Sequence, residues 1–230
     1  MSKRSEIIDP SEYRKGVSGL VYTELAGWID LGHALGGDIT KALAKFSRGE
    51  VSSKPYYLVQ YEQVMRAGKF GTGRYIRWNI KRGRSQHEIH SILLAMLMRT
   101  AVLFENWQAQ SWFSWYTDSG FSGEDLVSDL LGFYGAVRPM NYITMLQPVS
   151  KEAALRRWDH YGPIGDYKNK GYKPLLFPDP AIKNVPLIPY KNNPPDFMTT
   201  ITPFTDFNSD IVRIIDNASV LNEYRGVRIP

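Results

Sequence analysis

Tyr22-Thr23-Glu24-Leu25-Ala26-Gly27-Trp28-Ile29-Asp30-Leu31-Gly32-His33-Ala34-Leu35-Gly36-Gly37-Asp38 is the stretch from which the fold prediction starts. Apolar residues recur near a 3.6-residue period from Leu20 to Phe46, which predicts a helix. Asp30 and His33 would share one face of that helix, because residues three apart are neighbours there. We interpret them either as an internal capping or hydrogen-bonded pair that orients a buried imidazole and keeps a helix kink in place, or as a functional pair. In the functional pair Asp30 fixes the tautomer of His33, and His33 acts as a base or a metal ligand.

The glycines at the end of this stretch divide the helical pattern. Gly36-Gly37 should break or bend the helix, and Asp38 should cap a second short helix from Ile39 to about Ser47. Residues 1–18 are polar and are expected to form a loose arm or a short helix.

The composition is that of a globular protein. Of 230 residues, 43% are hydrophobic and 22% are charged, so we expect a single domain over residues 1–230. The formal net charge of +5 favours acidic partners such as nucleic acid, anionic lipid or an anionic envelope polymer. The densest basic run, Lys81-Arg82-Gly83-Arg84, is accompanied by no recognised reading motif, so sequence-specific nucleic-acid binding is not expected.

Cysteine usage and apolar runs restrict the chemistry and the location. There is no cysteine, which excludes disulfides, thiolate nucleophiles and cysteine-held zinc. The first ten residues contain no apolar run and do not resemble a signal peptide. The most apolar segment, Ile92–Phe104, contains Arg99 and is shorter than the roughly 20 residues of a membrane span. We therefore expect a soluble protein with no transmembrane segment and no cleavable signal, cytoplasmic or delivered to the periplasm by a secretion system.

The middle of the chain predicts a hairpin followed by a buried helix. Alternating residues on both sides of a glycine-rich turn at 67–73 predict a β-hairpin over about 56–80. Ser85 and Glu88 have the spacing of a capping box, which predicts a helix from Ser85 to about Trp112. Both faces of this helix are largely apolar, so we interpret it as the central buried helix.

Two further helices and a proline-rich tail complete the prediction. Ser122 should cap a helix that ends at Gly132 or Gly135, and Ser150 should cap one that ends near His160. Ten of the fourteen prolines lie at or after residue 163. The predicted fold is therefore α+β and mainly helical. Its helical body with a hairpin spans 20–161, and an extended tail over 162–230 wraps it, with a short helix or strand at 209–217.

Two blocks resemble a family of bacterial, often envelope-associated proteins of unknown function. One is Ala26-Gly27-Trp28-Ile29-Asp30-Leu31-Gly32-His33, similar to an Ala-Gly-aromatic-Ile-Asp-Leu-Gly-His pattern. The other is residues 121–132, similar to a Phe-Ser-x-Glu-Asp-Leu-x-Ser-Asn-Leu-Leu-Gly pattern, from which the chain departs at Asp129. The resemblance covers about residues 20–140. It implies an association with the cell envelope and no particular reaction.

Histidines and carboxylates offer a metal site as one hypothesis. His33, His87 and His90, with a carboxylate such as Asp30, Glu24 or Glu105, are the nitrogen and oxygen ligands that zinc accepts. His87-Glu88-Ile89-His90 is not the His-Glu-x-x-His zinc helix, because its histidines are three residues apart. The alternative is that no metal or other cofactor is bound.

Acid–base hydrolysis is the other hypothesis. A carboxyl group desolvated by aromatic walls has a raised pKa and can act as an acid near neutral pH. Glu105, between Phe104 and Trp107, fits this description, and Glu24 is a second candidate. The structural alternative for Glu105 is a salt bridge at a helix end.

The leading functional hypothesis is a hydrolase of a bacterial envelope polymer, in particular peptidoglycan, with catalytic residues His33, Asp30, Glu105 and Glu24. Such a protein could be a secreted antibacterial effector, a toxin whose partners include an immunity or carrier protein. One alternative is a non-enzymatic interaction module that uses an aromatic surface and the proline-rich tail. Another is a metal-dependent hydrolase acting on nucleic acid or lipid.

Overall fold

The chain has an α+β fold in which strands are as prominent as helices. The structure, a computed structural model, describes residues 2–15, 17–108 and 122–229. Helices take up 38% of the chain and strands 25%, and the largest sheet has four antiparallel strands. The prediction of a mainly helical protein is therefore wrong, because segments expected as helix or as loose tail form strands.

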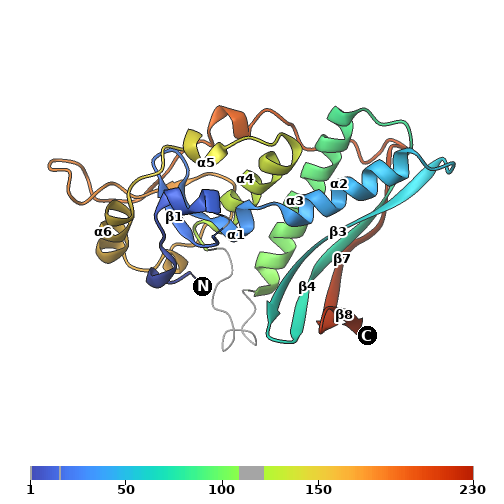
Figure 1. The fold of residues 1–230 in the computed structure, drawn as a ribbon. Coiled ribbons are helices and arrows are strands. Elements are labelled where there is room, and N and C mark those ends of the chain that lie inside the picture. The colour runs from blue at the N-terminus through green and yellow to red at the C-terminus, as the bar shows by residue number, and fades with distance from the viewer. Residues whose placement is uncertain (1, 16, 109–121, 230) are drawn as a thin grey trace. The chain divides into compact units, whose positions relative to one another are not determined.

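The chain divides into two compact units, each made of two separate segments. Unit 1 contains Met1–Gly36 and Asn106–Thr200, and unit 2 contains Gly37–Glu105 and Ile201–Pro230. The six α-helices and the strands β1, β3, β4, β7 and β8 are labelled in Figure 1. The elements of unit 1 are the 3₁₀ helices η1 (Arg4–Glu6), η2 (Pro10–Lys15), η4 (Ile164–Asp166) and η5 (Asp196–Met198), the strands β1 (Leu20–Thr23), β2 (Gly27–Asp30), β5 (Leu175–Leu176) and β6 (Tyr190–Lys191), and the helices α1 (Leu31–Ala34), α4 (Asp125–Val137), α5 (Tyr142–Met145) and α6 (Lys151–Tyr161).

The helix predicted from Leu20 is wrong over its first eleven residues, which form the antiparallel hairpin β1–β2. All four residues of β1 are buried, so the strand lacks the polar alternation that usually distinguishes strands from helices. The turn depends on Gly27, whose φ is +70° and where a Cβ would lie 2.2 Å from the carbonyl oxygen of Leu175. Only glycine tolerates both conditions.

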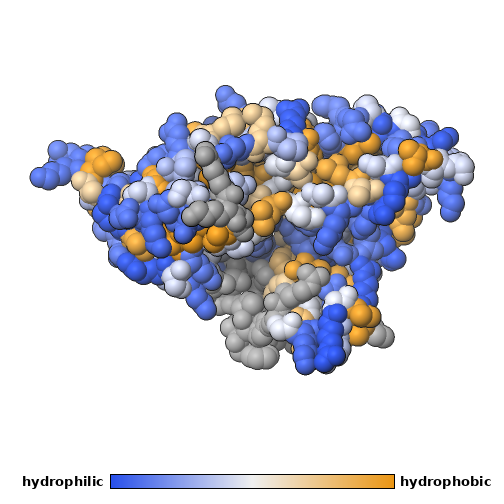
Figure 2. All heavy atoms as spheres, in the orientation of Figure 1, coloured by the Kyte–Doolittle hydropathy of each residue, from blue (hydrophilic) through white to orange (hydrophobic). Residues whose placement is uncertain are grey.

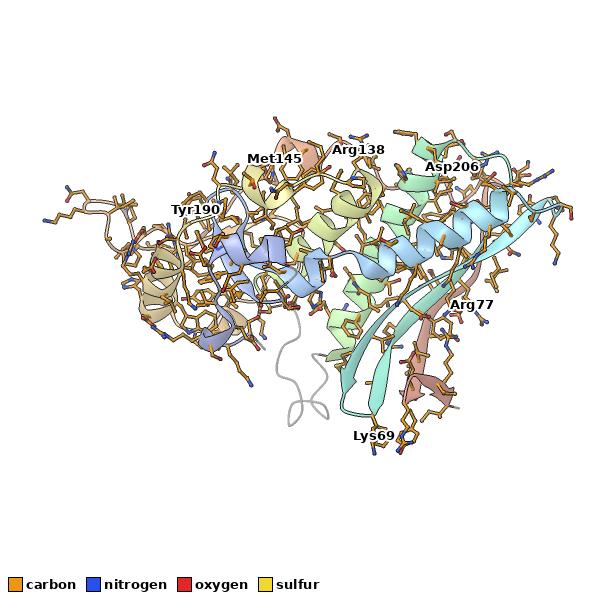
Figure 3. All side chains as sticks on the ribbon, in the orientation of Figure 1. Lys69, Arg77, Arg138, Met145, Tyr190 and Asp206 are labelled. Atoms are coloured by element: carbon orange, nitrogen blue, oxygen red, sulfur yellow. The ribbon has the colours of Figure 1, made fainter. Side chains whose placement is uncertain are left out.

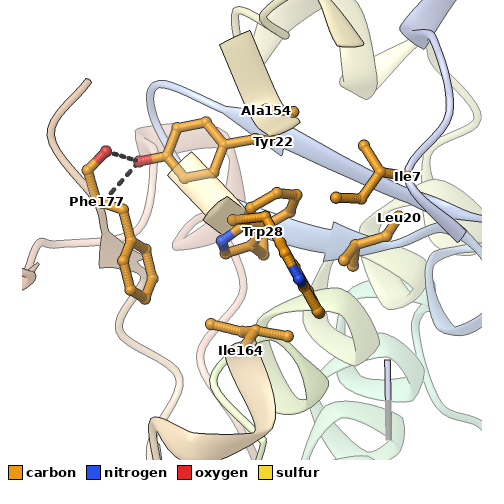
Figure 4. Packing of buried hydrophobic residues seen from close by; sticks show 8 residues of the cluster. Ile7, Leu20, Tyr22, Trp28, Ala154, Ile164 and Phe177 are labelled. Atoms are coloured by element: carbon orange, nitrogen blue, oxygen red, sulfur yellow. Dashed lines mark hydrogen bonds between the residues drawn. The ribbon is translucent and has the colours of Figure 1, made fainter. Parts of the chain in front are cut away.

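The hairpin β1–β2 contributes to an aromatic core in unit 1 (Figure 4). Trp28 meets Tyr22 and Trp158 edge to face, with ring centroids 5.2 and 5.7 Å away. The Tyr22 hydroxyl donates to the carbonyl oxygen of Phe177 at 2.9 Å and accepts from its N–H at 2.7 Å. Burial raises the pKa of Tyr22 to about 12. The cluster comprises Ile7, Leu20, Tyr22, Trp28, Ala154, Trp158, Ile164 and Phe177.

Unit 2 is built on a four-stranded antiparallel sheet, in the order β3-β4-β7-β8. Its elements are α2 (Gly37–Glu50), β3 (Tyr56–Ala67), β4 (Phe70–Lys81), α3 (Gln86–Gln108, of which the last three residues belong to unit 1), β7 (Val212–Tyr224) and β8 (Val227–Ile229). The predicted hairpin is confirmed, with Tyr56 opposite Lys81 and Ala67 opposite Phe70. Helix α2 packs on β3, where the rings of Phe46 and Tyr57 meet at 6.2 Å.

Two of the predicted helix caps are confirmed. The hydroxyl of Ser85 accepts from the N–H of Glu88 at 3.2 Å, and the Glu88 carboxylate accepts from the N–H of Ser85 at 2.8 Å. This reciprocal bonding is the capping box that begins α3. The Ser150 hydroxyl accepts from the N–H of Ala153 at 3.3 Å and begins α6.

The proline-rich tail does not stay extended to its end. Residues 162–211 contain only short elements, but Val212–Tyr224 joins the sheet as β7 beside β4. The pairing begins at Ile80 with Val212 and ends at Phe70 with Tyr224, interrupted by a bulge near Arg77. A strand is one of the two forms predicted for residues 209–217.

Helix α3 is the one described helix that is long and apolar enough to cross a membrane, by length and composition alone. More than half of this segment, Gln86–Asn106, is buried inside the protein. The core helix of a soluble domain has the same properties, and the fold has the character of such a domain.

Candidate functional site

The two blocks that resemble the envelope-associated family, residues 26–33 and the described part of 121–132, come together in unit 1. The first block ends in β2 and α1, and the second forms the start of α4. The backbone N–H of Asp30 donates to the Ser128 hydroxyl at 3.0 Å, and that hydroxyl donates to the carbonyl oxygen of Glu124 at 2.8 Å. The end of strand β2 is thereby fastened to the first turn of α4.

His33 and Asp129 form an ion pair where the segment β2–α1 contacts α4. Nδ1 of His33 lies 2.9 Å from Oδ1 of Asp129. The Asp129 side chain is only 7% exposed, whereas that of His33 is 39% exposed. No described residue of unit 1 hydrogen-bonds to Nε2 of His33. The Nδ1 edge of the imidazole is thus held by a buried carboxylate, while part of the His33 side chain remains accessible to solvent.

The surroundings favour the protonated form of His33. Burial by itself lowers the pKa of the imidazole, but the charge of Asp129 and its hydrogen bond act in the opposite direction. The carboxylates of Asp125 and Asp30 add to the attraction, and the pKa of His33 is raised well above 6.5. The surroundings therefore favour the imidazolium at neutral pH. The role of His33 as a base or a metal ligand stays a prediction.

The backbone around the pair is fixed by a helix cap. The carboxylate of Asp30 accepts from the N–H of Gly32 at 2.7 Å and of His33 at 3.4 Å, and so caps α1. Of the two structural forms expected for Asp30 and His33, the capping form is present. The side-chain contact between Asp30 and the imidazole is not formed, because the Asp30 carboxylate bonds to the backbone instead. Asp30 therefore positions His33 through the main chain, and Asp129 orients the ring.

Two glycines allow α1 to approach α4 closely. Gly36 follows α1 with a φ of +60°, and a Cβ there would lie 2.3 Å from the carbonyl oxygen of Gly132. A Cβ on Gly132 would lie 2.7 Å from the carbonyl oxygen of His33. Side chains at either position would separate the helices and with them the His33–Asp129 pair. The predicted break at Gly36-Gly37 is confirmed, since α1 ends at Ala34 and α2 begins at Gly37.

A buried carboxylate, Glu124, lies at the start of α4. Its oxygens accept from the hydroxyls of Ser2, at 2.6 Å, and of Ser122. The N-cap of α4 is Glu124, so the prediction of Ser122 as the cap is wrong. The reason is that the Ser122 hydroxyl donates to Glu124, while its N–H donates to Asp125 at 3.0 Å.

Glu24 lies at the other end of the β1–β2 hairpin. It follows β1 in the turn, whereas Asp30 pairs with Leu20 at the open end. Its carboxylate, in a side chain 48% exposed, lies 2.8 Å from a guanidinium nitrogen of the buried Arg157. Arg157 also donates to the carbonyl oxygen of Phe177 at 2.9 Å. These contacts support a structural role for Glu24.

The remaining predicted residues, His87, His90 and Glu105, all lie on α3 in unit 2. His87 is exposed in the first turn, His90 is half-buried, and Glu105 is buried. Among the residues that the structure describes, no group of three or more His, Asp or Glu side chains is placed to hold a metal ion. The metal set His33, His87 and His90 and the catalytic role of Glu105 stay predictions.

Asp129 is the functional candidate that sequence reasoning did not assign. It appears in the sequence as the position at which the second block departs from the family pattern, which has asparagine there. A carboxylate buried on the apolar face of a predicted helix is the signal that could have identified it, because such a group needs a partner.

Comparisons with protein families, curated proteins and solved structures find no match to this chain. The resemblance of the two blocks to an envelope-associated family accordingly stays a prediction.

Proposed function

We propose that the chain is a hydrolase in which His33, oriented by Asp129, is the general acid. The observation that carries the proposal is the 2.9 Å bond from the buried carboxylate of Asp129 to a half-exposed imidazole. A carboxylate that holds one ring nitrogen directs the other nitrogen at a substrate, as in many histidine-dependent active sites.

The charge state of His33 defines its part in the reaction. Because its pKa is raised, the imidazolium predominates at neutral pH and donates the Nε2 proton to the leaving group as the scissile bond breaks. Water supplies the hydroxyl group to the other fragment, and the remaining water proton returns to His33. The cycle consumes one water molecule and leaves the enzyme unchanged.

A bacterial envelope polymer, in particular peptidoglycan, is the substrate class that we propose. The net charge of +5 suits an anionic polymer, and the two blocks that form the site are those that resemble the envelope-associated family. A secreted antibacterial effector is the biological role that fits this chemistry, with an immunity or carrier protein as its partner.

Digestion of purified sacculi tests the proposal. Wild type should release soluble fragments, and His33→Ala and Asp129→Asn should each lower the rate at least about 100-fold, the usual contribution of a general acid. His160→Ala is the matched control, because His160 is an exposed histidine of unit 1 that belongs to none of the predicted sites. Thermal unfolding of each variant shows that it folds. Equal, background release by wild type and His33→Ala would refute the hydrolase.

A non-enzymatic interaction module is the second candidate. It is favoured by exposed apolar side chains at one end of the sheet in unit 2, among them Phe70 and Val227. In that case His33→Ala leaves binding to the partner intact, whereas polar substitutions at Phe70 or Val227 abolish this binding.

A further inference from the structure

Two β-turns of unit 2 lie side by side at one end of the sheet. Gly68-Lys69 joins β3 to β4, and Arg225-Gly226 joins β7 to β8. The backbone N–H of Arg225 donates to the carbonyl oxygen of Lys69 at 2.6 Å, which ties the turns together. Figure 1 shows both turns at the same end of the sheet, and Figure 3 marks it with Lys69.

The turns have defined backbone conformations that hold their flanking side chains in place. Arg225 and Gly226 have φ values of +51° and +77°, as in a type I′ hairpin turn. Gly68 has a φ of +60° while Lys69 is not in the positive-φ region, as in a type II′ turn. Both are the tight two-residue turns that twist with the strands, so the residues beside them project from a rigid frame.

Apolar side chains next to these turns are directed into solvent. Phe70 is 63% exposed and Val227 is 68% exposed, and Tyr224 beside them is also exposed. The rings of Phe70 and Tyr224 form a pair with centroids 5.0 Å apart. Figure 2 shows hydrophobic and hydrophilic surfaces next to each other at this end of the sheet. Exposed apolar groups that gather in this way usually mark an interaction site.

Cations accompany the apolar groups. Lys69 and Arg225 are exposed, and no described carboxylate forms a salt bridge with either. The guanidinium of Arg225 lies 5.6 Å from the centroid of the Tyr224 ring. A third cation, Arg228, is paired with Glu62 and contributes no net charge. We call Lys69, Phe70, Tyr224, Arg225 and Val227 the turn surface; its formal charge is positive.

We propose that the turn surface is a docking site for a membrane that contains anionic phospholipid. Aliphatic and aromatic side chains beside cations match the layers of a bilayer interface, in which acyl chains lie beneath anionic headgroups. An anionic polysaccharide would satisfy Lys69 and Arg225 but offers no apolar phase to Phe70 and Val227. The lipid surface is therefore the occupant that uses both kinds of group. This inference does not depend on the proposed hydrolase.

Vesicle co-sedimentation of the full chain tests the site. The probes are phosphatidylcholine vesicles and vesicles in which part of the phosphatidylcholine is replaced by phosphatidylserine. Wild type should sediment with the anionic vesicles and much less with the neutral ones. Lys69→Glu/Arg225→Glu should weaken binding by at least about 25-fold, since each cation near an anionic surface contributes about fivefold. Phe70→Ser/Val227→Ser should weaken it by at least about tenfold, because buried apolar area is lost.

Matched controls separate the site from general surface effects. Val51→Ser/Lys54→Glu changes an exposed valine and an exposed lysine elsewhere in unit 2 and should leave binding unchanged. His33→Ala should also bind as wild type does, so a failed hydrolase does not affect this result. Absence of sedimentation with anionic vesicles, or equal loss in the control double variant, would overturn the proposal. Binding to purified sacculi that the turn-surface variants abolish, without vesicle binding, would overturn it in favour of a polymer.

Discussion

Nδ1 of His33 and Oδ1 of Asp129 lie 2.9 Å apart, although 96 positions separate the two residues in the sequence. The approach is produced by the backbone: α1 follows directly from β2, and two glycines let it lie against α4. A buried carboxylate that bonds a half-exposed imidazole is an arrangement suited to moving protons. It differs from the Asp30–His33 pair that a helix would have formed.

Replacing Asp129 by asparagine tests the origin of the charge on His33. Asp129→Asn keeps a hydrogen-bonding group but removes the negative charge, so the pKa of His33 should fall. NMR titration of the imidazole C–H protons measures this pKa, and His33→Gln identifies the resonance. An unchanged pKa would mean that Asp125 and Asp30 supply the attraction instead.

The same pair should make stability depend on pH. The pKa of His33 is higher in the folded protein than in the unfolded chain, where it is about 6.5. The ion pair therefore contributes its full stabilisation at pH values below about 6.5. This contribution is lost as the pH rises through the pKa of His33 in the folded protein. Wild type should therefore lose stability relative to Asp129→Asn as the pH increases from neutral to alkaline. Urea denaturation of both proteins across that range measures the difference. A constant difference would contradict the assigned ion pair.

Neighbouring glycines provide a test of the close approach between α1 and α4. Gly36→Ala should lower the free energy of unfolding by at least about 2 kcal/mol, because a Cβ meets the Gly132 carbonyl oxygen and φ is positive. Gly37→Ala is the matched control, since open space surrounds that position, and its stability should be unchanged or slightly higher. Urea denaturation measures both. Equal effects at the two positions would contradict the contact.

Glu24 and Arg157 should differ sharply in their effect on stability. Arg157→Met removes a buried cation that bonds to Glu24 and to the Phe177 carbonyl oxygen, and should cost about 3 kcal/mol or more. Glu24→Gln should cost less than about 1 kcal/mol, because half of that side chain is exposed. Urea denaturation gives both values. If Glu24→Gln instead abolished sacculus digestion at full stability, Glu24 would have a catalytic role.

Local signals predicted the elements whose sequence patterns have a single interpretation. The β3–β4 hairpin has alternating residues and a glycine turn, and α3 has a capping box before a long apolar run. In each case the interactions that define the element lie within a short segment. The β1–β2 hairpin was predicted as a helix because its strand residues are almost all buried, which removes the alternation. For residues 209–217, where β7 begins, the sequence predicted either a short helix or a strand. It could not distinguish the two, because the strand β4 that pairs with β7 is more than 130 residues away.

The sequence alone determined that a chemically unusual stretch surrounds Asp30 and His33, and that a second block begins near Ser122. Residue types and their spacing are enough to identify these two blocks, since titratable residues among glycines and apolar residues can be recognised in the sequence. Only the tertiary structure decided which carboxylate meets the imidazole. Asp30 is nearest in sequence, but its carboxylate is taken by the N–H groups that begin α1, and the packing of α4 brings Asp129 to the ring instead. That choice depends on backbone bonding and on helix contact, and neither is encoded in spacing along the chain.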